Sequence, residues 1–156
     1  MKQKTNGGFS LIELLIVVTI IGIIASIALP NLLASRRAAN EGSAQQSMRT
    51  ISSCESTYLY TYGGGSYADL AGLAAKTLTD NVLASGSKSG YTFVAVPEAG
   101  NPPLYWAYAV PITTSGIGQT GTRRFAISED GVLRADSTLA APADETEVRN
   151  MSPSGN

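Results

Sequence analysis

The sequence has no histidine and only one cysteine, Cys54, among its 156 residues. Without histidine it lacks the commonest general base, the usual nucleophile pairs and most types of zinc site. A single cysteine allows neither an intrachain disulfide nor a metal cage built from thiolates. Eleven Lys and Arg against twelve Asp and Glu give a net charge of −1, which excludes a basic nucleic-acid binder on bulk electrostatics. We therefore expect no enzymatic activity, no metal and no cofactor.

The apolar residues are concentrated near the start of the chain. Sixteen of the twenty-one residues in 9–29 are hydrophobic, and Glu13 is the only charged one. As a helix this run is about 30 Å long, which matches the hydrocarbon core of a bilayer. A cleaved signal peptide is the alternative, but the run exceeds a usual h-region and ends in Leu29-Pro30-Asn31 without a small-residue cleavage site. The pattern favours a retained membrane helix.

Glu13 is the informative residue of this run. A carboxylate inside a membrane helix costs on the order of 3 kcal/mol on insertion scales, so a plain anchor has no use for one. Because Glu13 lies near the helix start, the helix dipole and the nearby interface offer one explanation. The other is that Glu13 finds a positive partner inside an assembly, and sequence physics leaves the two open.

The residues around this position resemble a known family. A short basic leader, MKQKTNGG, precedes Gly8-Phe9-Ser10-Leu11-Ile12-Glu13 and the unbroken apolar run. This combination resembles the class III leader of a type IV prepilin, and the resemblance covers residues 1–62. It implies that a prepilin peptidase of the inner membrane cuts between Gly8 and Phe9 and methylates the new amine of Phe9. It also implies that Glu13 matches the N-terminal amine of a neighbouring subunit.

The resemblance further implies that the protein occupies two locations in succession. The precursor is a single-pass protein of the inner membrane, and assembly machinery in that membrane extracts mature subunits into a homopolymeric filament. We expect a structural subunit of an extracellular type IV pilus, with no nucleic acid as partner. The alternatives are a pseudopilin of a type II secretion system, in a pseudopilus that spans the periplasm, or a minor pilin at a tip or in DNA uptake.

The helical pattern continues to residue 62. Gly22 and Pro30 are weak points, and both are candidates for helix flexibility. Residues 30–62 form an amphipathic half, whose apolar stripe repeats every three or four residues. The predicted stripe comprises Ala44, Met48, Ile51, Cys54, Tyr58 and Tyr62. On this stripe Cys54 reads as a small buried hydrophobe.

The remainder predicts a small head packed on that stripe. Gly63-Gly64-Gly65 ends the helix, and residues 63–90 form a variable loop with a short helix near 67–75. Alternating runs within 91–135 predict three or four antiparallel strands, including a hairpin at Glu129-Asp130-Gly131. Residues 136–156 are polar; with no disulfide to close them, they are held by packing or form a loose tail. The fold class is α+β: a long N-terminal helix packed on a small antiparallel sheet.

Two groups of side chains in the head allow a second interpretation. The tyrosines and Trp106 form two clusters, which favour helix–sheet packing over adhesion or charge transport. Glu129, Asp130 and Asp136 offer carboxylates for calcium, but hairpin turn chemistry is the simpler explanation. Many type IV pilins close a C-terminal loop with a disulfide, and this chain departs from that pattern.

Overall fold

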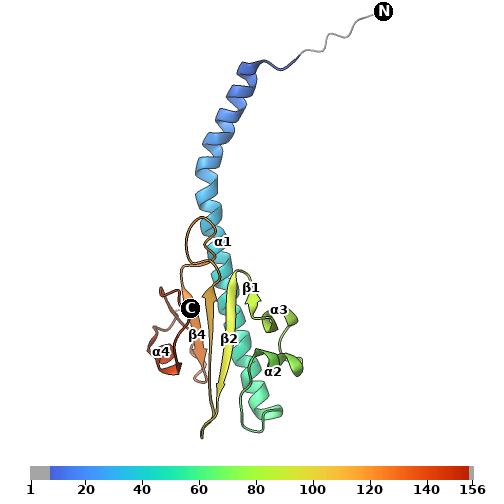
Figure 1. Cartoon of the computed structure of the whole chain (residues 1–156), viewed down its shortest axis with the longest axis vertical. Helices are drawn as coiled ribbons and strands as arrows, with labels where there is room; N and C mark the ends of the chain where they lie inside the picture. The colour runs from blue at the N-terminus through green and yellow to red at the C-terminus, as the bar shows by residue number, and fades with distance from the viewer. Residues whose placement is uncertain (1–7, 155–156) are drawn as a thin grey trace, which may run out of the picture. The chain divides into compact units, whose positions relative to one another are not determined.

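The computed structural model describes residues 8–154 and has the α+β architecture expected from the sequence (Figure 1). Residues 1–7 of the leader lie outside the described residues. The chain divides into two compact units, the first ending at Ser35 and the second beginning at Arg36. One helix, α1, contributes to both units, and the sheet belongs entirely to the second.

Helix α1 spans Leu11–Thr61 and continues without a break through Pro30. It ends where three consecutive glycines follow Tyr62. The amides of Tyr62 and Gly63 both donate to the carbonyl of Tyr58, and Gly64 and Gly65 adopt positive φ angles of 57° and 91°. Glycine takes this left-handed conformation without steric cost, so the glycines stop the helix, one residue before the predicted end.

Five antiparallel strands form a simple meander in the order β1-β2-β3-β4-β5. The strands are β1 Ser87–Lys88, β2 Tyr91–Glu98, β3 Leu104–Pro111, β4 Arg124–Ser128 and β5 Arg134–Asp136. The central pairing places Phe93 opposite Ala109 and Ala107 opposite Ile127. The predicted runs form β2 to β5, whereas the two-residue β1 is not predicted because it is too short to carry a period.

The main core lies between the second half of α1 and one face of the sheet. Ala44, Met48 and Ile51 of the helix are fully buried in one cluster with sheet residues such as Phe93 and Phe125. Because strand side chains alternate between faces, large aromatic residues of β2, β3 and β4 reach this cluster from every second position. The helix–sheet packing expected from the stripe is therefore present in the second unit.

Three short helices, each with an N-cap, complete the second unit. They are α2 Leu70–Ala75, α3 Asn81–Ala84 and α4 Glu145–Asn150. Each begins at an aspartate whose side chain accepts a backbone N–H of the first turn: Asp69, Asp80 and Asp144. Such N-caps satisfy amides that the helix itself cannot pair, and they explain why these brief segments fold as helices.

The C-terminal segment packs on the other face of the sheet. Val148 and Met151 are buried against Trp106 and Ala126, and Ala135 donates its amide to the carbonyl of Ser152. Of the two alternatives that the sequence leaves for residues 136–156, the described part to residue 154 is held by packing and does not form a loose tail.

The predicted apolar stripe of α1 is wrong at two places. Tyr62 is half exposed, because the helix ends one residue earlier; its ring lies against Tyr58 and under the ammonium of Lys76. Glu41, which is not among the predicted stripe residues, is buried. A charged residue at a buried position points to a specific set of partners, described below.

Candidate assembly surface

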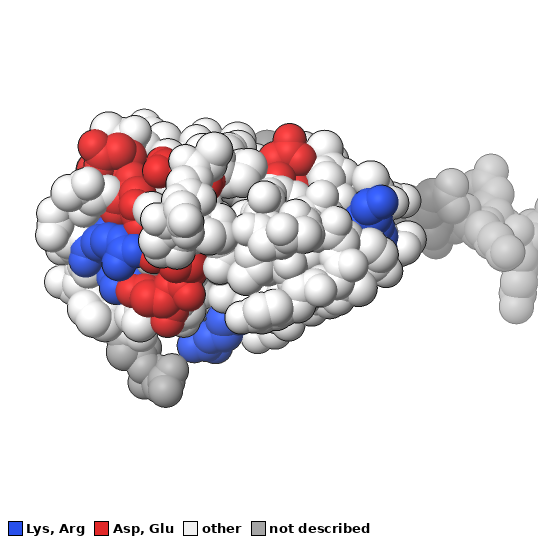
Figure 2. All heavy atoms as spheres, turned by 90° about the horizontal axis from the view of Figure 1, so that it is seen from below, with Lys and Arg blue, Asp and Glu red and all other residues white. Residues whose placement is uncertain are grey.

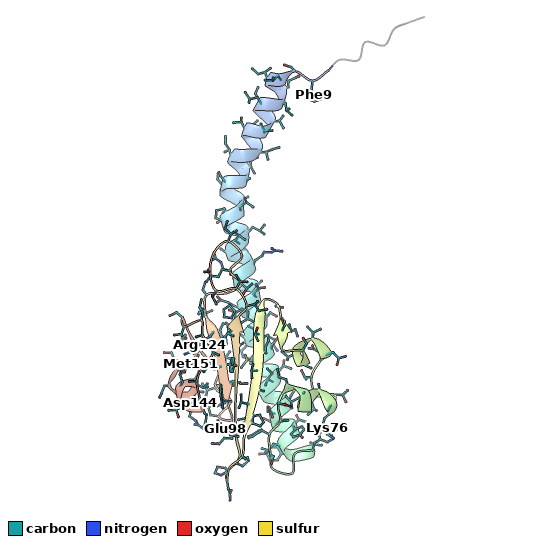
Figure 3. All side chains as sticks on the ribbon, viewed as in Figure 1. Phe9, Lys76, Glu98, Arg124, Asp144 and Met151 are labelled. Atoms are coloured by element: carbon teal, nitrogen blue, oxygen red, sulfur yellow. The ribbon has the colours of Figure 1, made fainter. Side chains whose placement is uncertain are left out.

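The first half of α1 exposes a continuous apolar surface. From Phe9 to Leu32 fifteen large hydrophobic residues are exposed, and Figure 3 shows their side chains projecting outward along the ribbon. This is the only helix of the described residues that is long and apolar enough to cross a membrane, and its most apolar window is not buried at all. Isolated hydrophobic residues are normal on a surface, but an apolar surface this large marks a membrane or protein contact.

One half of a capping box, the bond from Glu13 back to the residue before the helix, sets the start of α1. The backbone amide of Ser10 donates to Oε2 of Glu13 at 2.9 Å, and the amide of Leu14 donates to the carbonyl of Ser10. Glu13 is therefore the third residue of the helix and reaches back to the residue before it. In this arrangement Glu13 has a local role, stabilising the helix start, which is one of the two explanations that the sequence leaves open.

The polar residues of the apolar half bond to their own helix. The hydroxyls of Thr19 and Ser26 donate to the carbonyls of Leu15 and Ile23, and the amide of Asn31 donates to Ile27 at 3.2 Å. Such bonds hide a polar group from an apolar environment. Asn31 also supplies a donor in the turn where Pro30 has none. Gly22 has open space where a side chain would be.

Glu41 joins α1 to the segment before β4. Its Oε1 accepts the amide and the hydroxyl of Thr122, both at 2.7 Å, and its Oε2 accepts two N–H groups of Arg123 at 3.1 and 3.0 Å. Burial alone would raise the pKa of Glu41, but these bonds outweigh burial and hold the pKa below its ordinary value. Glu41 therefore fixes a long-range contact as a charged residue.

Glu55 is the opposite case, a carboxyl without compensation. It is fully buried; Oε2 accepts the amide of Ala68 at 3.1 Å, while Oε1 has no hydrogen-bond partner. Burial raises the pKa of Glu55 to about 7, the Ala68 amide opposes the shift, and the charge of Asp69 adds to it. Glu55 therefore ties α1 to the segment before α2 at an energetic cost that grows when it ionises.

Arg124 holds the C-terminal segment to the sheet (labelled in Figure 3). Its side chain is only 3% exposed and donates to both oxygens of Asp136, to the carbonyl of Ala140 and to Glu147. Burial alone would lower the pKa of Arg124, but the hydrogen bonds with Asp136 and Glu147 outweigh burial and raise the pKa above its ordinary value. This cluster joins β4, β5 and α4, and it fixes the segment 136–147 against the sheet.

The acidic residues near the hairpin are occupied by turn bonds and ion pairs. Oδ1 of Asp130 accepts the hydroxyl of Ser128 and the amide of Val132, and Asp130 also pairs with Arg134. Asp136 belongs instead to the Arg124 cluster. Figure 2 shows acidic and basic side chains side by side on this face of the molecule, with no single-signed patch. Among the described residues no group of three acidic, cysteine or histidine side chains is placed to hold a metal ion.

Most aromatic residues of the head pair within the fold, whereas Tyr60 is 86% exposed. Tyr67 lies 4.6 Å from Tyr105 between ring centroids, and Trp106 stacks on Tyr108 at 5.6 Å. Trp106 also donates its indole N–H to Glu98 at 2.9 Å. These contacts agree with the packing interpretation of the two clusters.

The predicted cleavage and assembly residues lie at the start of α1, whereas the predicted flexibility residues Gly22 and Pro30 lie inside the helix. Phe9 is 86% exposed two residues before the helix, Gly8 precedes it without neighbouring atoms, and Glu13 lies in the first turn. Sequence reasoning missed Glu41, Glu55 and Arg124 as structural contacts. The two glutamates had a signal, because Glu41, Ala44, Met48, Ile51 and Glu55 repeat at helical spacing.

Comparisons with known proteins agree on the nature of the chain. The family described as "Prokaryotic N-terminal methylation motif" matches residues 3–29. "Type IV wide pilus major component PilA4" of Thermus thermophilus is 34% identical over 127 residues, covering 77% of this chain and 92% of that protein. "Type IV major pilin protein PilA" of Myxococcus xanthus is 29% identical over 113 residues, covering 72% of this chain but 47% of its own length. No solved structure matches.

A helix with an exposed apolar half and a small α+β head define a class of proteins that carry a candidate membrane-spanning helix near the N-terminus. Within this class, the extent of the match to PilA4 shows the family: the chain belongs to the type IV pilins.

Proposed function

We propose that this chain is a structural subunit of a type IV pilus. A prepilin peptidase cleaves the precursor between Gly8 and Phe9, and the mature subunits polymerise through the apolar half of α1. The observation that carries this proposal is the apolar surface from Phe9 to Leu32, which is exposed in the single chain and follows a basic leader. Such a surface requires a membrane before assembly and other copies of itself afterwards.

We further propose that Glu13 pairs with the amine of Phe9 on a neighbouring subunit. Packing the apolar helices together removes both groups from water, and either charge left alone would be costly. The pair then works mainly as a register device, because its Coulombic gain roughly offsets its desolvation. Glu13 is available for this role because its present partner is a single backbone amide close to the cleavage site.

The remaining roles follow from the family. N-methylation falls on Phe9, and Gly22 and Pro30 give α1 flexibility when filaments pack or stretch. The partners are further copies of the chain, the prepilin peptidase and the assembly machinery of the inner membrane. The chain is a single-pass inner-membrane protein before assembly and part of an extracellular filament afterwards. Its role is structural, with no catalytic task.

The experiment is to shear producing cells, collect the extracellular fibres and measure the intact mass and N-terminus of their main protein. A dominant species that begins at methylated Phe9 is expected of a major pilin. The same mature protein found only in the cell envelope would favour a type II secretion pseudopilin or a minor pilin. A chain that keeps Met1 would contradict processing altogether.

A further inference from the structure

The connection between β3 and β4 is a closed loop with an exposed isoleucine at its tip. The amides of Thr113 and Thr120 donate to Oγ1 of Thr120 and the carbonyl of Thr113, at 3.2 and 3.0 Å. Ile112 donates its amide to Gly90 at the base. Ile117, between these bonds, is 84% exposed and belongs to neither hydrophobic cluster of the described residues. The loop therefore presents an apolar side chain from a fixed frame.

The same loop is bound to α1 directly after the apolar half. Arg37 donates to Oε1 of Gln119 at 3.1 Å, and Asn40 donates to the carbonyl of Thr120 at 3.0 Å. The bonds of Glu41 to Thr122 follow one residue later on the helix. Three successive contacts fix the loop to residues 37–41, so that a partner that binds it meets little further cost of ordering.

The composition of the loop suits an apolar partner. Residues 112–122 contain no Asp, Glu, Lys or Arg, although charged residues flank the loop in the chain at Arg123 and Arg124. Ile112 is also half exposed. Burying this segment would therefore not strand a charge, which is the largest penalty for an interface.

The chain itself carries the matching surface. Of the large exposed hydrophobic residues among those described, fifteen lie in residues 9–32, and six are scattered over the rest. The loop contacts residues 37–41 of α1, and these residues directly follow in sequence the apolar segment through which pilins polymerise. We propose that the loop 112–122 is a second assembly contact, with Ile117 docking on the apolar half of α1 of another copy. This inference rests on the proposed function.

The test uses the full-length chain with Ile117→Cys. Its only native thiol, Cys54, is buried and donates to the carbonyl of Leu78, and burial raises its pKa, so the unsubstituted chain gives the background. We expect a polar maleimide to label Ile117→Cys in assembly-blocked cells and at least about tenfold more slowly in filaments. The matched control is Val82→Cys on α3, half exposed, which should label at the same rate in both.

The partner is identified by attaching a benzophenone maleimide to Ile117→Cys in the assembly-blocked cells, restoring assembly, and irradiating the filaments. We expect adducts to peptides from residues 9–35 of another subunit. Unchanged labelling in filaments, or equal protection of Val82→Cys, would overturn the proposal. So would adducts confined to the head, or protection already present in the assembly-blocked membrane pool, which indicates a lipid contact. If no filaments form even from the unsubstituted chain, the proposed function fails instead.

Discussion

At the scale of single residues, three glutamates on one helix show three ways of placing a carboxylate. Glu13 is exposed and caps the helix start, Glu41 is buried with four hydrogen bonds, and Glu55 is buried with one. The same side chain therefore serves as a cap, a tether and a buried carboxyl whose ionisation is not compensated. Which role it takes depends on the number of donors that the surrounding chain supplies.

Glu13→Gln separates the local role of Glu13 from the proposed intersubunit role. Glutamine at the third helical position still accepts the Ser10 amide, so the capping box survives while the charge is lost. We expect Glu13→Gln and Glu13→Ala alike to lower the yield of sheared filaments at least about tenfold, with processing at Phe9 intact. Mass spectrometry of the membrane pool and the fibre yield measure both effects.

The control for this experiment is Ser10→Ala, which keeps the backbone amide that Glu13 accepts. It should assemble as the unsubstituted chain does. Normal filament yield from Glu13→Gln would show that capping suffices and would contradict the charge pairing with Phe9.

Glu55→Gln should remove a pH dependence of stability. The folded chain keeps the Glu55 proton up to about pH 7, whereas the unfolded chain releases it near pH 4.5. Between these values the folded state binds more protons, so the free energy of unfolding falls as pH rises, by on the order of 3 kcal/mol, and is level above pH 7. We expect Glu55→Gln to lack this loss and to be the more stable form at pH 8.

The measurement is thermal unfolding of the detergent-solubilised chain from pH 5 to 8, followed by fluorescence of Trp106, the only tryptophan. Glu41 provides the contrast, because its lowered pKa gives stability that is lost only as pH falls below the ordinary carboxyl range. Identical pH profiles for the unsubstituted chain and Glu55→Gln would show that Glu55 ionises freely in the folded state.

At the scale of elements, the C-terminal segment depends on one buried side chain. Arg124→Gln should lower the free energy of unfolding by about 2–3 kcal/mol, because Asp136 and the Ala140 carbonyl lose their donor in a largely buried place. We expect proteases to cut first within residues 137–150. Limited proteolysis with mass spectrometry locates those cuts, and urea unfolding measures the loss of stability.

Arg149→Gln is the matched control for that substitution. Arg149 lies on α4, pairs with Glu145 of the same helix and also binds Glu129, but its side chain is 43% exposed. Exposed ion pairs contribute less than about 1 kcal/mol, so the change should be small. Equal effects of the two substitutions would mean that Arg124 has no special part in holding the segment.

The elements that the sequence predicts are those with a local signal. The period of the stripe indicates the second half of α1, the glycines at 63–65 indicate its end, and alternation indicates the long strands. The Arg124 cluster has no such signal, because its partners Asp136 and Glu147 come together only after the β4–β5 hairpin and α4 have formed. Glu41 and Glu55 fit the helical period but are not predicted as buried, since charged residues rarely occupy buried positions.

At the scale of the whole molecule, the motif at the N-terminus carries most of the functional prediction. The hydrophobic run requires a membrane or an assembly. The combination of Gly8, Phe9 and Glu13 then narrows the resemblance to one protein family. In the proposed filament the assembly site differs from an enzyme's, because its other half would lie on another copy of the chain. The sequence of one subunit would then define the contact surface, and a neighbour would supply the side chains that cover it.

Gly8→Leu tests processing at this scale. A bulky side chain next to the cut should prevent the peptidase from accepting the backbone. Gly8 has open space around it, so the leucine should meet no clash within the chain itself. We expect the full precursor to accumulate in the membrane, with its mass including residues 1–8, and no fibres in the sheared fraction. Gly22→Ala, a glycine with equally open space, should leave cleavage intact. A mature N-terminus at Phe9 in Gly8→Leu would contradict this prediction.

The Arg124 cluster also frees the head from thiol chemistry. Ion pairs and hydrogen bonds close its C-terminal segment, and its only thiol lies inside the core. Folding of this head therefore needs no oxidant and no disulfide-forming catalyst, and a reducing or oxygen-free surrounding leaves it intact. We expect a fibre of such subunits to stay intact under reducing conditions, which would break the disulfides of heads that depend on them.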